Sequence, residues 1–182
     1  KRQVINQSIN NPLFRESLIN LNSKGKLSMV ISGKAYWASI ATPNTTFDPD
    51  GVWTVDVGNL DKTSIDQLKE DGLTVKNKGD DRGDFVTIKR KVRRKDGQMN
   101  RTPDLVDAKK RQMSNTMIGN GSDVNVLYST YDWEFKGRKG TSADLKSIQV
   151  TNLIPYSSGV EEDFDEVDGY ASDSANPSEA FA

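Results

Sequence analysis

The segment from Phe85 to Lys95 combines the alternation of a β-strand with a high density of positive charge. Six of its last seven residues are lysine or arginine, and Val86, Ile88 and Val92 recur at the spacing of a strand with one buried face. Alternate side chains point to opposite sides of a sheet, so the other face would carry Phe85, Thr87, Lys89, Lys91 and Arg93. Such a strand is suited to bind a polyanion, and the alternative interpretation is a solvated edge strand.

Arg90 interrupts this pattern because it falls in phase with the buried residues. We therefore expect either a β-bulge that turns Arg90 outward or an early departure of the strand from the core. The pair Asp96-Gly97 then predicts a tight turn and a returning strand.

Charge is divided unevenly along the 182 residues. Residues 1–158 carry 25 basic and 18 acidic side chains, a balance of +7, whereas residues 159–182 carry eight acidic side chains and no basic one. A basic body beside an acidic tail indicates a polyanionic partner. The tail is too polar to fold alone, so its few apolar residues are expected to contact a partner, unless the tail serves only solubility.

The chain contains neither cysteine nor histidine. Disulfide scaffolds, thiolate chemistry, imidazole bases and ordinary zinc sites are therefore excluded, and we expect no metal, no cofactor and no enzymatic activity. No apolar run approaches the roughly 20 residues that cross a bilayer, and the start lacks the core of a signal peptide. A soluble cytoplasmic protein is the expectation.

Further strands are expected on both sides of the basic segment. One spans residues 27–41 with an interruption at Gly33, and one spans 52–57 with Trp53 in the core. The last spans 145–155 and would bury Ile148, Val150 and either Leu153 or Ile154. Residues 1–26 are expected to form an arm that packs on the body or on a second subunit, which would make a homodimer.

A single short helix is expected over residues 63–70. Thr63 and Asp66 have the spacing of a capping box, and Gly72 would end the helix. The connector over residues 73–84 is expected to be mobile. One helix among strands predicts an all-β fold with a barrel that the helix closes at one end.

A strand with an internal change of phase is expected after residue 121. Val124, Val126 and Tyr128 alternate toward the core, whereas Tyr131 and Trp133 continue in the opposite phase, followed by Phe135. We therefore expect a bulge near residues 129–130 that carries the aromatic rings onto a groove. Trp37 is a second aromatic candidate for stacking, with a core position as the alternative.

The sequence resembles one known family through five short motifs in register. They are Trp37–Pro43, Gly51–Asp56, Leu105–Met113, Ile118–Ser129 and Tyr131–Trp133, followed by a similar acidic tail at Glu161–Val167 with Gly169-Tyr170. This pattern is similar to that of the replicative single-stranded DNA (ssDNA)-binding proteins of short-tailed bacteriophages. The resemblance implies a five-stranded antiparallel OB-fold barrel over residues 27–158, an arm over 1–26 and an acidic tail over 159–182.

The sequence departs from the family pattern at several points. Asp50 stands where a basic residue precedes Gly-Val, and Leu127 stands where a basic residue precedes Tyr128. The spacing from Tyr128 to Tyr131 is two residues shorter, and the chain ends Phe181-Ala182 instead of on phenylalanine. We infer that the cluster over residues 89–95 supplies the missing charge contacts.

From the residues and the resemblance together we expect a protein that coats ssDNA during phage DNA replication, recombination and repair, in the cytoplasm of the infected host. Cations would release counterions along the phosphates, and exposed rings would stack on bases. The expected nucleic-acid contacts are Trp37, Phe85, Lys89, Lys91, Arg93, Arg94, Arg101, Lys109, Arg111, Tyr131, Trp133, Lys136, Arg138 and Lys139.

The tail is expected to compete with DNA and, as the resemblance implies, to recruit the phage polymerase and helicase-primase. Its expected contact residues are Glu161, Glu162, Asp163, Phe164, Asp165, Glu166, Asp168 and Phe181. The first alternative is an RNA-binding or nucleic-acid chaperone module on the same barrel. Two others are an assembly protein and a metal-dependent nuclease. The nuclease is supported only by Pro103-Asp104 and Asp107-Ala108-Lys109, which resemble part of a nuclease metal motif.

Overall fold

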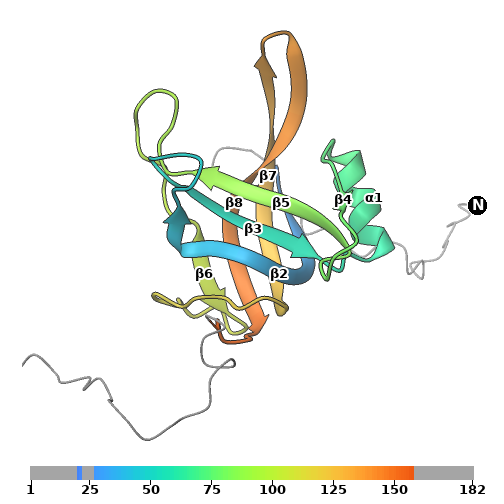
Figure 1. The fold of residues 1–182 in the computed structure, drawn as a ribbon, viewed down its shortest axis with the longest axis vertical. Coiled ribbons are helices and arrows are strands. Elements are labelled where there is room, and N and C mark those ends of the chain that lie inside the picture. The colour runs from blue at the N-terminus through green and yellow to red at the C-terminus, as the bar shows by residue number, and fades with distance from the viewer. Residues whose placement is uncertain (1–19, 22–26, 158–182) are drawn as a thin grey trace, which may run out of the picture.

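The computed structural model describes residues 20–21 and 27–157 as a strand-rich body with one helix (Figure 1). The elements are β1 (Asn20–Leu21), β2 (Leu27–Asn44), β3 (Val52–Gly58), α1 (Lys62–Glu70), β4 (Lys76–Asn77), β5 (Asp84–Lys91), β6 (Asp104–Asp107), β7 (Ser122–Phe135) and β8 (Arg138–Asn152). In the described part of the chain, no helix is long and apolar enough to cross a membrane.

The sheet closes on itself into a five-stranded barrel. Its strand order is β5-β3-β2-β7-β8, and β8 returns to β5 through the pair Lys89 and Asp144. The closing pair is parallel, while the other four pairings are antiparallel. The expected all-β fold, with a five-stranded barrel and one short helix, is confirmed, and the parallel closing pair is its one departure from the expected antiparallel pairing.

The core is filled by aliphatic side chains that alternate along the barrel strands. Val55 and Val57 of β3, and Val124 and Val126 of β7, are buried, and so is Trp53, as the sequence predicts. On β8, Ile148 and Val150 are buried as expected. The prediction for the end of that strand was wrong, because both apolar residues at 153 and 154 are exposed.

The N-cap of helix α1 lies two residues before the predicted one. Asp61 is the N-cap, and its carboxylate accepts a hydrogen bond of 2.7 Å from the Ser64 amide, so the predicted cap at Thr63 was wrong. Gly72 follows with a positive φ of 79°, as expected for a helix stop. The helix buries Leu68 against the barrel.

A hydrogen bond ties the end of α1 to the barrel core. The hydroxyl of buried Tyr128 donates to Asp71 Oδ2 over 2.7 Å, and Asp71 is the C-cap residue of α1. Burial and this carboxylate raise the pKa of Tyr128 well above its ordinary value. The hydroxyl therefore stays protonated and remains a donor across the physiological range.

Replacing Tyr128 by phenylalanine is expected to lower the free energy of unfolding by about 1–2 kcal/mol. The variant keeps the ring in the core and leaves the Asp71 carboxylate without its donor. Urea denaturation measures the change, and Tyr131→Phe, whose side chain is exposed, is the matched control. Equal stabilities for the two variants would show that the bond contributes nothing.

The register shift within the β7–β8 pair arises on β8, and β7 itself carries no extra residue. The register with β8 shifts between Leu127 and Tyr128, whose partners are Ser147 and Leu145, so Lys146 is the extra residue. The predicted bulge at residues 129–130 of β7 was therefore wrong. Tyr131 and Trp133 are exposed because they lie on the opposite face of β7 from Val126 and Tyr128.

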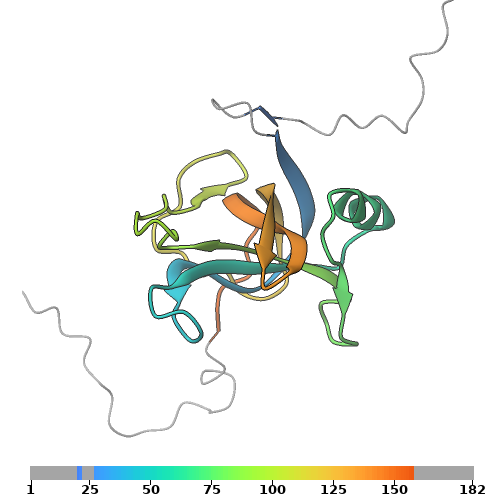
Figure 2. The ribbon, with the colours of Figure 1, turned by 90° about the horizontal axis from the view of Figure 1, so that it is seen from above.

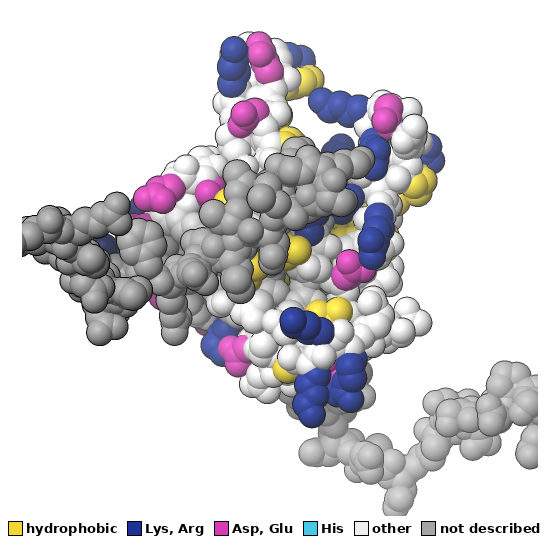
Figure 3. All heavy atoms as spheres, turned by 180° about the vertical axis from the view of Figure 1, so that it is seen from behind, with side chains coloured by type: hydrophobic (Ala, Val, Ile, Leu, Met, Phe, Trp, Pro, Cys, Tyr) yellow, Lys and Arg dark blue, Asp and Glu magenta, His cyan; other side chains and the backbone are white. Residues whose placement is uncertain are grey.

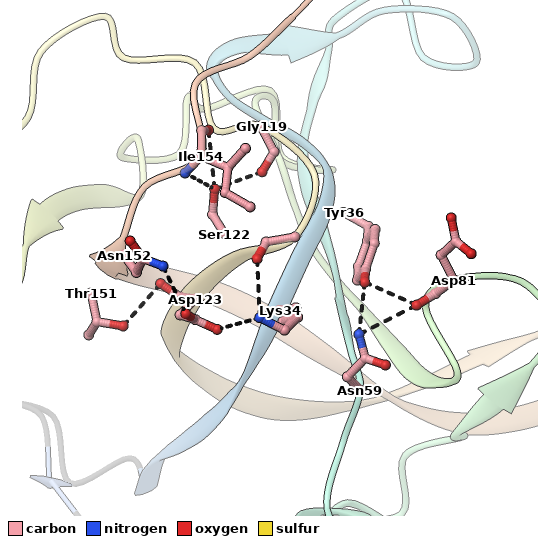
Figure 4. A network of polar contacts seen from close by, with 11 residues as sticks. Lys34, Tyr36, Asn59, Asp81, Gly119, Ser122, Asp123, Thr151, Asn152 and Ile154 are labelled. Carbon is pink, nitrogen blue, oxygen red and sulfur yellow. Dashed lines mark hydrogen bonds and ion pairs between the residues drawn. The ribbon is translucent and has the colours of Figure 1, made fainter.

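A polar network fixes the end of the barrel where β7 begins (Figure 4). The buried hydroxyl of Ser122 donates to the Gly119 carbonyl over 2.7 Å and accepts from the Ile154 amide at 2.9 Å. Lys34 and Asp123 form an ion pair of 2.9 Å between β2 and β7. The bonds between Ser122 and Ile154 hold the segment after β8 against the barrel, and the ion pair joins β2 to β7.

Candidate nucleic-acid interface

Two arms rise from the same side of the barrel and enclose an open groove of about 560 Å³. One arm is the outer part of the β7–β8 hairpin, and the other is the turn over residues 92–100 (Figures 1 and 2). Figure 3 shows the hollow between two projections, with Lys and Arg side chains on both and within it. The groove is lined by Lys89, Arg90, Lys91, Arg93, Arg94, Lys95, Asn100, Ser129, Tyr131, Trp133, Ser142 and Asp144.

The floor of the groove is the line where β5 meets β8. The Arg90 side chain is only 12% exposed, and its Nη1 donates to Asp144 Oδ2 over 3.1 Å. Arg90 keeps a regular register opposite Trp53, so the expected bulge was wrong, and β5 continues to Lys91. The strand accepts an inward arginine because Asp144 of the closing strand neutralises it.

The hairpin arm presents its aromatic residues on one face. Tyr131 and Trp133 line the groove and are 43% and 38% exposed. Phe135 shares their alternation, and its exposed ring lies under the Lys136 ammonium at 5.3 Å. Lys136 and Gly137 both have positive φ, which is typical of a tight two-residue hairpin turn.

The second arm is the turn predicted from Asp96-Gly97. The Gly97 amide donates to the Arg94 carbonyl, and an isolated bridge joins Arg93 to Met99. Asn100 fixes the arm to β5, because its amide group donates to the Lys91 carbonyl and accepts from Arg94 Nε at 2.7 Å. The arginine side chain is thus held at the groove.

The six cations of the groove fall into two groups. Arg90 is paired with Asp144, Lys91 with Asp48 at 3.1 Å, and Arg93 with Asp50 at 3.2 Å. The remaining three have no carboxylate within 4.0 Å among the described residues; they are Lys89, Arg94 and Lys95.

Asp48 and Asp50, the partners of Lys91 and Arg93, both lie on the loop between β2 and β3. The hydrogen bond from Lys91 is the main reason that the pKa of Asp48 lies below its ordinary value. Asp48 therefore remains ionised at neutral pH and competes with any other anion for Lys91.

Several predicted contact residues lie outside this groove. Arg101 pairs with Asp104 at 2.9 Å, and Arg111 pairs with Asp107 at 2.7 Å within the turn after β6. The Asp107 carboxylate also accepts backbone amides of that turn, so it serves as a local cap. No cluster of three potential metal ligands occurs in the described ranges, 20–21 and 27–157. The other predicted cations outside the lining are Lys109 in the same turn and Lys136, Arg138 and Lys139 near the hairpin tip.

The prediction that Phe85 faces the nucleic acid was wrong. Its ring is 1% exposed and lies 3.8 Å from the guanidinium of Arg82. Arg82 is itself buried and donates to Asp56 at 2.7 Å, so the connector expected to be mobile is anchored here. Trp37 stacks on the same guanidinium at 4.2 Å but is 59% exposed and does not line the groove.

The sequence did not lead us to predict a role for Phe47, the aromatic residue of the β2–β3 loop. Phe47 is 96% exposed and borders a shallow depression that shares Lys89 with the groove. An aromatic side chain in a loop rich in Pro, Asn and Asp was the signal available in the sequence. The predicted tail contacts over residues 161–181 lie outside the described residues.

No family model and no curated protein matches the chain. Solved structures do. The ssDNA-binding protein gp2.5 of bacteriophage T7 has a TM-score of 0.55 and 18% identity, covering 76% of this chain and 98% of that one. The ssDNA-binding protein of bacteriophage Enc34 has a TM-score of 0.53 and 13% identity, covering 77% and 88%. This chain has the fold of these phage proteins. The Enc34 protein in complex with ssDNA gives a TM-score of 0.53 at 12% identity, covering 75% of this chain and 91% of that chain.

Proposed function

We propose that this protein binds ssDNA with little sequence preference, in the groove between the β7–β8 hairpin and the turn over residues 92–100. The observation that carries the proposal is that six cationic side chains and two exposed aromatic rings line the same groove. Cations would take the phosphates, and Tyr131 and Trp133 would stack on bases, at about 1–3 kcal/mol for each base. The solved structures of similar fold, which include a complex with ssDNA, support this assignment.

The expected biological role is to coat ssDNA during phage replication and recombination in the host cytoplasm. The eight acidic side chains of residues 159–182 would compete with DNA for the basic body and, once displaced, recruit the phage polymerase and helicase-primase. Removing residues 159–182 should then tighten ssDNA binding, and weaker binding would contradict the competition.

The test of the function is a titration with poly(dT) that follows tryptophan fluorescence in a Trp37→Phe background. Trp53 is buried, so Trp133 is the remaining exposed tryptophan, and stacking should quench it. Four to six neutralised phosphates predict a log–log slope of affinity against salt of roughly −3 to −4. A matched RNA strand distinguishes the alternative RNA-binding function, because preferential RNA binding would overturn the DNA assignment.

Replacing Asp48 and Asp50 together by asparagine is expected to tighten ssDNA binding several-fold. Both carboxylates now occupy groove cations, and their removal frees Lys91 and Arg93 for phosphates. The salt dependence should become steeper by about 1.4 in log–log slope, because two more counterions would be released.

The charge-matched control is Asp66→Asn with Glu70→Gln on the exposed side of α1. It removes the same two negative charges away from the groove. If the control tightens binding as much as the loop variant does, the gain reflects net charge and the loop carboxylates have no local role.

A further inference from the structure

Trp133 borders three cavities, of which two are the basic groove and a smaller pocket beside it. On one side it lines the basic groove, and on the other it borders a pocket of about 270 Å³ with Leu73, Thr87 and Ala143. Lys89 also borders both cavities. The plane of the indole therefore decides how much room each cavity has and which ring face is open to a base.

The position that supports this ring is Gly140 of β8. Gly140 is the register partner of Trp133 in the β7–β8 hairpin. A Cβ atom built on Gly140 would lie 2.6 Å from Trp133 Cζ2, 2.8 Å from Cε2 and 3.1 Å from Nε1. These separations are well inside van der Waals contact, so the indole now rests against the bare backbone of the opposite strand.

The backbone at Gly140 gives no other reason for glycine. Gly140 has no positive φ, unlike Gly137 in the turn of the same hairpin. The backbone conformation at position 140 therefore permits alanine. The three atoms nearest to the added methyl group all belong to the Trp133 ring. Because both residues lie on the exposed arm, the ring would move and the strand pairing would stay.

We propose that Gly140 is a positioning residue that sets the orientation of Trp133 for stacking on a nucleobase of a bound strand. This inference rests on the proposed function, since it assigns to Gly140 a role in that same groove. A methyl group at position 140 tilts the indole away from the strand, and the ring then no longer presents its face at the edge of the basic groove.

The test compares Gly140→Ala, Trp133→Ala and the double variant, each in a Trp37→Phe background, by dT oligonucleotide affinity. Trp133→Ala should weaken binding roughly fivefold to a hundredfold, as expected for the loss of one stacking contact. Gly140→Ala should weaken it at least threefold, and in the Trp133→Ala background it should have no further effect. Acrylamide quenching of the Trp133 fluorescence in Gly140→Ala should rise as the ring leaves the hairpin.

The outcomes separate the inference from the function beneath it. Suppose that Trp133→Ala weakens binding, while Gly140→Ala has the oligonucleotide affinity and the acrylamide quenching of the parent. The positioning role of Gly140 is then wrong and the proposed function stands. If Trp133→Ala leaves the affinity unchanged, the proposal that bases stack on Trp133 is wrong, and so is the role assigned to Gly140. An equal loss from Gly140→Ala with and without the indole would indicate damage to the hairpin and would also overturn the inference. The melting temperature of each variant shows whether the barrel is intact.

Discussion

Replacing Lys89, Arg94 and Lys95 together by glutamine is expected to weaken ssDNA binding roughly a hundredfold at about 50 mM salt. These three groove cations have no carboxylate partner among the described residues, so phosphates need not displace a competing anion to reach them. Losing three released counterions should also make the log–log slope of affinity against salt shallower by about 2. Binding isotherms at several salt concentrations measure both effects.

The matched control is the triple variant Lys109→Gln, Lys110→Gln and Arg111→Gln. It removes the same charge from the turn after β6, which does not line the groove. Its affinity should stay within a few-fold of the parent's. Equal losses in the two triple variants would mean that the body binds DNA through its overall charge, and the groove would have no special part.

Replacing Arg82 by methionine is expected to lower the melting temperature by roughly 10 °C. Arg82 is the buried centre of a cluster in which Asp56 is also largely buried and accepts from Arg82 Nη1 and from Thr87. Methionine fills the space but leaves the Asp56 carboxylate without its cation. The rings of Trp37 and Phe85 lose the guanidinium on which they stack.

Two comparisons make this second prediction specific. Arg101→Met removes an exposed arginine that is also paired with an aspartate, and its melting temperature should hardly change. Adding Asp56→Asn to Arg82→Met should restore part of the loss, since no buried charge is then unpaired. If Arg82→Met alone has the melting temperature of the parent, the cluster does not anchor the connector before β5.

The sequence predicted the strands well where one face is buried. Val124, Val126 and Tyr128 follow strict alternation, and the core they predict is the core of the barrel. The register shift at Tyr128 was not predictable in this way. The extra residue is Lys146 on the partner strand, and alternation within one strand does not report on its neighbour.

The errors in the candidate site come from side-chain contacts that strand alternation does not report. Phe85 belongs by alternation to the outer face, yet Arg82 covers it there. Arg90 points inward because Asp144, 54 residues later, meets it. Alternation indicates neither partner. The basic strand and the exposed rings of Tyr131 and Trp133 could be predicted because each follows from its own sequence spacing.

The most direct test of the groove is an NMR titration of the ¹⁵N-labelled protein with a dT oligonucleotide, following the amide shifts residue by residue. Our account predicts that the largest changes occur over residues 89–95, 129–133 and 142–144, the segments that contribute the lining of the groove. Residues 107–111, in the basic turn after β6, should change little. Large changes in that turn, with small changes between the two arms, would contradict the proposal that ssDNA binds in the groove.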